Sequence, residues 1–259
     1  MNIAFAALSG LFTGGVLNAL ADRLPPLHPD FDGPFIADRR RTLAPWEWLP
    51  LLSFAGAMRS RRMVIANNRL RYPLLEAATA ALFALSWAKY GAEPWHAGVA
   101  CAFSACLLAL GAIDVETRYL PFKLSIPTLI TAMAISPVWL GSGPEGIATH
   151  GWWEGAAAAG AGFAFFYGIH LLGRVTGRPL MGDGDAYVVA ATGALLGFQL
   201  MLVAFYITAV AGGLFAFAVL GARAFGYKTR VIPYGPYIVL GGLTALFYGR
   251  TIIDWSMRL

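Results

Sequence analysis

Residues 186–222 read AYVVAATGALLGFQLMLVAFYITAVAGGLFAFAVLGA, a run of 37 residues without one charged side chain. A single helix of that length would extend roughly 55 Å at ~1.5 Å per residue, too long for one crossing of a hydrocarbon layer about 30 Å thick. Gly197, Phe198 and Gln199 are the natural place for a turn near the middle of the run. The run therefore predicts two membrane-spanning helices joined near Gly197.

Other uncharged runs of the chain are also long enough to span a bilayer, which takes roughly 17–25 residues. They are residues 1–21, 94–113, 124–144, 155–173 and 231–249. A weaker candidate, residues 72–90, carries Glu76 near one end and Lys89 near the other. With the two halves of 186–222 the total is about eight transmembrane helices, so the expected fold class is an all-α polytopic membrane protein.

The composition supports this class. Of the 259 residues, 58% are hydrophobic and 13% are charged, whereas a soluble globular chain is ~45–50% apolar and ~25% charged. A soluble enzyme, a disordered protein and a coiled coil are all disfavoured by these proportions. The two cysteines, Cys101 and Cys106, lie in one apolar run and form no C-x-x-C pair, so they indicate neither a zinc site nor a disulfide framework.

The distribution of basic residues tests the eight spans independently. If the N-terminus is outside, the inner segments hold 16 of the 19 Lys and Arg residues; these segments are 22–71, 114–123, 174–185 and 223–230. This positive-inside bias predicts that both termini are periplasmic and that a cytoplasmic loop follows the first helix. A signal peptide is the alternative for residues 1–21, but no basic residue precedes the apolar run, which favours an uncleaved helix.

The long polar segment, residues 22–71, ends in a stretch rich in arginine. Arginines at the inner face are expected to meet lipid headgroups. Nucleic acid is not an expected partner, because the arginines coincide with the orientation signal and have few aromatic residues interleaved with them.

Two aspartates at span ends are the main candidates for function, because burying an ionisable group in a membrane is costly. Asp114 ends the third span and Asp185 opens the sixth, and the topology places both at the inner face although 71 positions separate them. Two carboxyl groups brought together can share one proton, so that one acts as an acid while the other activates water. That is the requirement of aspartyl proteolysis.

The glycines around the second aspartate agree with such a role. Gly182 and Gly184 flank Asp183, and glycine allows a backbone to approach a substrate closely. The alternative is an ordinary inner loop in which Asp183 or Asp185 caps the following helix. Two further polar residues are weighed here: Glu76 either pairs with Arg71 or serves a polar interior site, and His170 is expected to be a hydrogen-bonded core residue rather than a ligand.

Six short motifs occur in order along nearly the whole chain. Three belong to the N-terminal part: residues 15–18 (GVLN) with 23–25 (RLP), residues 46–53 (WEWLPLLS), and residues 71–76 (RYPLLE) with 79–80 (TA). Three belong to the rest: Asp114 with Thr117, Leu120 and Pro121 in the pattern D-x-x-T-x-x-L-P, residues 182–185 in the pattern G-x-G-D, and residues 232–237 (IPYGPY).

This set of motifs resembles that of the type IV prepilin peptidases, the GxGD membrane aspartyl peptidases that process type IV pilin and type II secretion pseudopilin precursors. The resemblance implies that Asp114 and Asp185 are the catalytic pair. It also implies that Gly182, Asp183, Gly184, Thr117 and Pro121 support the two motifs. The expected activity is cleavage of the leader from a prepilin or pseudopilin at the cytoplasmic membrane face.

A second activity is implied by the same resemblance, namely methylation of the new N-terminus with S-adenosylmethionine. Glu47, Arg71 and Glu76 mark a possible substrate or methyltransferase region. The resemblance divides the chain into a first transmembrane helix (1–21), a cytoplasmic, methyltransferase-associated loop (22–71) and a transmembrane aspartyl peptidase domain (72–259). Prepilins or pseudopilins and membrane lipids are the expected partners, and the bacterial inner membrane is the expected location.

The chain departs from the family pattern in two places. Many members carry two C-x-x-C pairs in the first inner loop and bind zinc there, whereas residues 31–68 contain no cysteine, so zinc is not expected. The family often has Lys two residues after the second aspartate, and here that residue is Tyr187. A different class of function remains as an alternative, a small proton- or cation-coupled transporter that uses the same aspartates, although the internal repeats typical of transporters are not evident.

Overall fold

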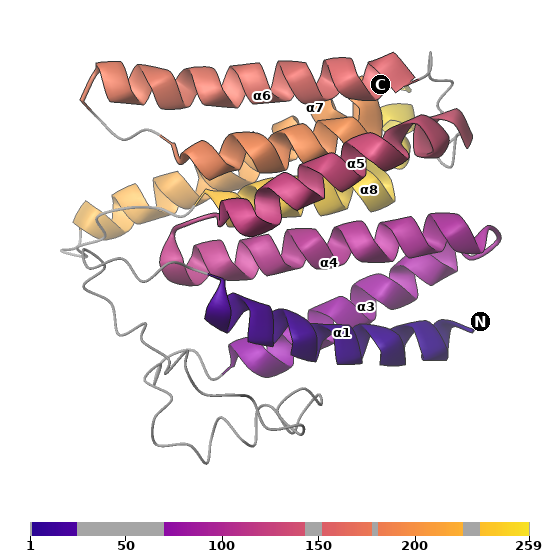
Figure 1. The fold of residues 1–259 in the computed structure, drawn as a ribbon. Helices are drawn as coiled ribbons and strands as arrows, with labels where there is room; N and C mark the ends of the chain where they lie inside the picture. The colour runs from indigo at the N-terminus through magenta and orange to yellow at the C-terminus, as the bar shows by residue number, and fades with distance from the viewer. Residues whose placement is uncertain (1, 25–69, 143–151, 178–180, 225–233, 259) are drawn as a thin grey trace. The chain divides into compact units, whose positions relative to one another are not determined.

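The computed structural model describes residues 2–24, 70–142, 152–177, 181–224 and 234–258 (Figure 1). These residues form seven α-helices and no strand. Six of the seven are long and apolar enough to cross a membrane. The described part of the chain is thus an all-α polytopic membrane protein, as its composition predicts. The helix that does not qualify is α3 (Arg71–Tyr90), the segment in which the sequence already shows Glu76 and Lys89.

The chain divides into two compact units, Met1–Ile113 and Asp114–Leu259. In the first unit, α1 (Ile3–Arg23) and α3 pack side by side (Figure 1). The Asn2 side chain caps α1 by accepting a hydrogen bond from the Phe5 N–H at 2.8 Å. Small residues allow the two helices to come close, since a Cβ atom built on Gly14 would lie only 2.5 Å from the Cα of Glu76.

The long uncharged run forms α7 (Asp183–Ala224), which is interrupted at Gly197. Gly197 has φ 75° and ψ 179°, a conformation that glycine adopts and other residues rarely do. The break lies at the position predicted for a turn, which confirms that residues 186–222 are not one continuous helix. The part of α7 before Gly197 runs from residue 183 to 196, roughly 21 Å, and the part after it from residue 198 to 224, roughly 40 Å, at ~1.5 Å per residue.

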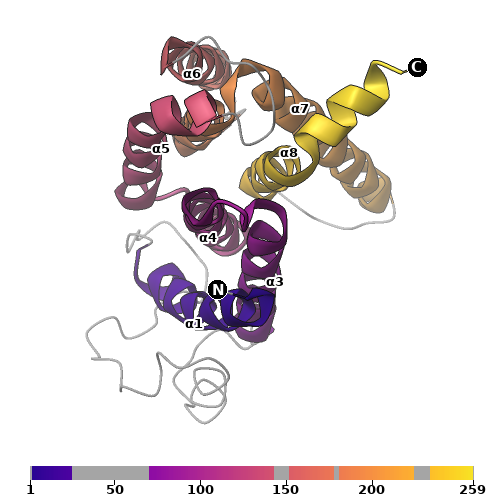
Figure 2. The same ribbon diagram turned by 90° about the vertical axis from the view of Figure 1, so that its right-hand side faces the viewer.

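The second unit is built around α7, which contacts α5 (Phe122–Ser142), α6 (Trp152–Val175) and α8 (Gly235–Ser256) (Figure 2). The contact with α8 is close and partly polar. The buried Thr208 hydroxyl donates to the Ala204 carbonyl at 2.8 Å and to the Tyr237 carbonyl at 3.1 Å. A Cβ atom built on Gly241 would overlap the Ala204 carbonyl oxygen and Thr208 Oγ1. The start of α8 is therefore held against the second half of α7.

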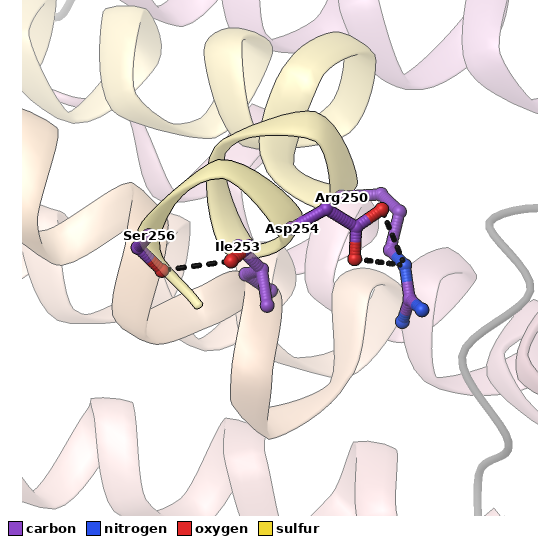
Figure 3. A network of polar contacts seen from close by, with 4 residues as sticks. All are labelled: Arg250, Ile253, Asp254 and Ser256. Atoms are coloured by element: carbon purple, nitrogen blue, oxygen red, sulfur yellow. Dashed lines mark hydrogen bonds and ion pairs between the residues drawn. The ribbon is translucent and has the colours of Figure 1, made fainter. Parts of the chain in front are cut away.

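The far end of α8 carries a separate polar network (Figure 3). Arg250 Nε donates to the Asp254 carboxylate, with 3.1 Å to Oδ1 and 3.3 Å to Oδ2, and the Ser256 hydroxyl donates to the Ile253 carbonyl at 2.8 Å. The two charged side chains are 37% and 40% exposed. Half-exposed pairs of this kind contribute little to stability, about 0.3–0.5 kcal/mol, so this end of α8 offers suitable positions for control substitutions.

Candidate active site

Asp114 lies in the last turn of α4 (Pro94–Thr117) and is buried, with 5% of its surface exposed. Its Oδ2 atom accepts a hydrogen bond of 2.9 Å from the backbone N–H of Gly235, the first residue of α8, although 121 positions separate the two. The helix ends three residues after Asp114, at Thr117. Arg118 donates its N–H to the Asp114 carbonyl and has a φ of 54°, and the Thr117 hydroxyl donates to the Tyr119 carbonyl at 3.2 Å.

Asp185 lies in the first turn of α7 and is equally buried, at 5% exposure. Its Oδ2 atom accepts a hydrogen bond of 3.2 Å from the N–H of Gly182. The Asp183 carboxylate accepts instead from the N–H of the next residue, Gly184, at 2.9 Å. Asp183 thus bonds to the N–H of its immediate neighbour, whereas an N-cap side chain accepts from the N–H two or three residues later. Asp185 is the buried acid of the motif.

The two aspartate motifs meet in space. A Cβ atom built on Gly184 would lie 2.6 Å from the Cβ of Leu120 and 2.9 Å from its carbonyl oxygen, so the second motif packs directly on the first. Leu120 and Pro121 are both buried at this contact. Asp114 and Asp185 are near enough for the charge of Asp114 to act on Asp185. All seven residues that the two motifs contribute, from Asp114 to Asp185, belong to the second unit.

Tyr234 and Gly235, at the start of α8, join these motifs. The Tyr234 ring lies against Gly212 of α7, where a built Cβ atom would be 3.4–3.6 Å from the ring and its hydroxyl. Burial, and secondly the negative charge of Asp185, raise the pKa of Tyr234 above its ordinary value. Two consecutive residues therefore interact with the two aspartates: Gly235 with Asp114 and Tyr234 with Asp185. In the sequence, residues 232–237 are recognisable only as a family motif, with no role attached to Tyr234 or Gly235.

A row of aromatic side chains leads from Tyr187, just after Asp185, to His170, which contacts the residue before the G-x-G-D motif. The Tyr187 ring makes edge contacts with Phe122 and Phe163, with centroids 5.4 and 5.2 Å apart. Phe163 stacks on Tyr167, and Tyr167 stacks on His170. His170 Nδ1 lies 3.0 Å from the Met181 carbonyl oxygen, which can only accept, so Nδ1 carries the proton. The predicted hydrogen bond of His170 is confirmed, and its partner lies just before the G-x-G-D motif, but His170 is only partly buried and is not a core residue.

The residues predicted for a substrate or methyltransferase region belong elsewhere in the chain. Glu47 lies outside the described residues, whereas Arg71 and Glu76 are on α3 in the first unit. Glu76 is 1% exposed, and the Arg71 guanidinium lies 4.7 Å from the centroid of the Tyr72 ring. Nearby, Asn18 donates to the Tyr72 carbonyl at 3.2 Å, while its buried Oδ1 atom has no hydrogen-bond partner among the described residues.

No metal centre is evident in the part of the chain that the structure describes. Its His, Cys, Asp and Glu residues form no group of three or more that could hold an ion. Residues 31–68, where family members carry the zinc-binding cysteines, lie outside the described ranges.

Comparisons with known proteins show which proteins the chain is similar to. Residues 101–217 match the model of the type IV leader peptidase family, a range that contains both aspartates. The chain is 31% identical over 278 residues to a prepilin leader peptidase/N-methyltransferase of Burkholderia pseudomallei strain 1026b, covering 96% of this chain and 86% of that protein. It is 29% identical over 259 residues to the protein of that name from Bacillus subtilis, covering 96% of each. No solved structure matches significantly.

Proposed function

Because this chain belongs to the type IV leader peptidase family, we propose that it cleaves the leader from type IV prepilins or type II secretion pseudopilins and N-methylates the new N-terminus. The observation that carries the peptidase assignment is the pair Asp114 and Asp185. They come from motifs far apart in sequence, are both buried, and each accepts a backbone N–H from a glycine. Nothing in the comparisons favours the transporter alternative.

The proposed reaction is hydrolysis by two carboxyl groups and one water. The ionised aspartate takes a proton from the water as its oxygen attacks the scissile carbonyl carbon, and the protonated aspartate gives a proton to the carbonyl oxygen. Collapse of the tetrahedral intermediate breaks the C–N bond; the departing amine takes the proton that the first aspartate received from water, and the second aspartate regains its proton as the carbonyl re-forms. Neither aspartate becomes covalently bonded to the substrate.

The proposed topology has eight spans, with the aspartates at the cytoplasmic face of the bacterial inner membrane and both termini in the periplasm. This count treats the two parts of α7 as separate spans and α3 as the remaining one, and the interruption of α7 at Gly197 supports that division. The 16 of 19 basic residues in the inner segments support the orientation. A substrate helix lying in the bilayer would present its leader junction at this face.

Methylation would use S-adenosylmethionine, which supplies the methyl group from a positively charged sulfonium. The described residues of the first unit offer acceptors that fit a cationic ligand, the Glu76 carboxylate and the buried Asn18 Oδ1 atom. Arg71, on the same helix, would face an anionic group of the donor or of the substrate. We place Glu47, Arg71 and Glu76 in this region by the family motifs that contain them.

The test of the peptidase assignment is cleavage of a prepilin by Asp114→Asn and Asp185→Asn variants in proteoliposomes. Each amide keeps the size of the side chain and removes its acid–base function, so the rate is expected to fall by about 10²–10⁴-fold or more. Asp254→Asn, in the half-exposed pair at the other end of α8, is the matched control and keeps full activity. Wild-type cleavage by either active-site variant would refute the assignment.

The methyltransferase assignment has its own readout. Mass spectrometry of the processed pilin, with and without S-adenosylmethionine, is expected to show a gain of about 14 Da at the new N-terminus. A product that never gains this mass in the presence of the donor would restrict the protein to proteolysis.

A further inference from the structure

We propose that Gly235 is a positioning residue of the peptidase: its backbone N–H orients the carboxylate of Asp114, and the absence of a side chain provides the space that this carboxylate occupies. The proposal deepens the proposed function and rests on it, since it assigns a third chain segment to the aspartate pair. Neither the family motifs nor the comparisons assign Gly235 a role, and residue 235 lies beyond the range that the family model matches.

The contact between the two residues is direct and buried. The Gly235 N–H donates to Asp114 Oδ2 at 2.9 Å, and both residues are buried. A Cβ atom built on Gly235 would lie 2.7 Å from Oδ2, 2.8 Å from Cγ and 2.9 Å from Cβ of Asp114. Real Cβ atoms do not approach other heavy atoms this closely, so any larger residue at 235 must displace the carboxylate or the start of α8.

Glycine is required here for space and not for its backbone conformation. The described glycines with positive φ are Gly177 and Gly197, and Gly235 is not one of them. As the first residue of α8 it has an N–H without an intrahelical partner, which is free to point at a carboxylate. The next residue, Pro236, has no N–H and fits the first turn of a helix. The motif therefore offers a single oriented donor at this point of the site.

Tyr234 links the same turn to the second aspartate. Its ring is seated against Gly212 on α7 and lies 6.3 Å from the ring of Tyr237, measured between centroids. The charge of Asp185 acts on its hydroxyl. Because Tyr234 and Gly235 are adjacent, the seating of the Tyr234 ring on α7 restricts the movement of the backbone that carries the Gly235 N–H. Asp114 is thereby held in a fixed position relative to the element that carries Asp185.

The test is Gly235→Ala, which keeps the N–H and suits a helix start but adds the one atom for which there is no room. With a purified prepilin as substrate, kcat is expected to fall by about 100-fold, the scale of a 1 Å displacement of a catalytic group. KM is expected to change by less than about threefold, because the substrate-binding surface is untouched. Gly213→Ala is the matched control, since a Cβ atom there meets nothing within 4 Å and activity should be normal.

A double-mutant cycle distinguishes positioning from general instability. Any loss of melting temperature caused by Gly235→Ala should disappear in an Asp114→Gly background, which removes all three atoms that the new Cβ would meet. An equal loss in both backgrounds, or a normal kcat for Gly235→Ala in an enzyme that cleaves prepilin, would overturn the proposal. A wild-type protein that cleaves no prepilin would instead refute the proposed function, so the two failures are distinguishable.

Discussion

Gly184 lies against the backbone of Leu120, with 2.6 Å between a Cβ atom built on the glycine and the Cβ of the leucine. Leu120 follows Asp114 by six residues, and Gly184 immediately precedes Asp185. The spacing of the two acids is therefore set by a contact between the motifs that carry them. The second glycine of G-x-G-D is needed because only glycine lets the two backbones come this close.

Gly184→Ala is expected to push the two motifs apart. Because the neighbouring atoms are backbone and Cβ atoms that cannot rotate away, we expect a destabilisation of about 1–3 kcal/mol and a drop in kcat of at least about 10-fold. Gly168→Ala is the control, because a Cβ atom on Gly168 meets nothing within 4 Å. Prepilin cleavage and thermal unfolding in detergent measure the two effects, and a fully active Gly184→Ala enzyme would contradict this account of the spacing.

The proximity of Asp185 and Tyr234 predicts a titration effect. An ionised Asp185 disfavours the phenolate and so contributes to the raised pKa of Tyr234. In Asp185→Asn this charge is absent, so the phenolate should form at lower pH and the pKa should move down toward its ordinary value of about 10. Burial, the larger cause, remains, so the pKa should stay above that value.

This shift can be measured as the difference in phenolate absorbance between each protein and its Tyr234→Phe counterpart. Asp254→Asn is the control, because Asp254 follows Tyr234 by 20 residues, roughly 30 Å along α8 at ~1.5 Å per residue. An unchanged Tyr234 titration in Asp185→Asn would show that the two side chains do not interact.

The aromatic contacts of Tyr187 predict which replacements its position tolerates. Tyr187→Phe keeps the edge contacts with Phe122 and Phe163 and should leave unfolding unchanged. Tyr187→Lys, the residue common in the family, loses both contacts, each worth about 0.5–1.5 kcal/mol. Thermal unfolding of the two variants in the same detergent tests this, and equal midpoints would mean that the ring contacts do not stabilise the site.

The Thr208 hydroxyl predicts a stability effect at the start of α8. Thr208→Val preserves shape but removes the hydrogen bond to the Tyr237 carbonyl, and a cost of about 1 kcal/mol is expected. Thr244→Val is the matched control, because the exposed Thr244 hydroxyl donates only to Leu240, within its own helix. If the two substitutions lower the free energy of unfolding equally, the interhelical bond is not responsible.

The helices were largely predictable because a membrane-spanning helix requires a long apolar segment without charges, which is easily recognised in a sequence. A run of 37 uncharged residues is too long for a single crossing, so its length predicts a break, and the residues Gly197, Phe198 and Gln199 predict where the break lies. The meeting of the Asp114 and Asp185 motifs was also predictable, since the basic residues place both at one membrane face. Helix α3 illustrates the limit: its charged residues keep it below the hydropathy of a membrane span, so its assignment rests on topology.

The details of the site were less accessible, because they depend on backbone groups. The bond from the Gly235 N–H to Asp114 joins residues 121 positions apart and involves a donor that every residue except proline has. Nothing in the side chains marks it. The bond of His170 to the Met181 carbonyl also involves a backbone group. The sequence predicts that the histidine is hydrogen-bonded, but it does not identify the partner.

The glycine amides that hold the two aspartates determine how this protein can vary. A backbone N–H survives almost every substitution, so the hydrogen bonds to Asp114 and Asp185 are insensitive to the identity of the residue that donates them. Volume is what makes Gly235 sensitive, and likewise Gly184 between the two motifs, because one added carbon at either position collides with a neighbour. A saturation mutagenesis profile should therefore show isolated, intolerant glycines next to permissive positions such as Gly213, and selection at those positions would act on size and not on chemistry.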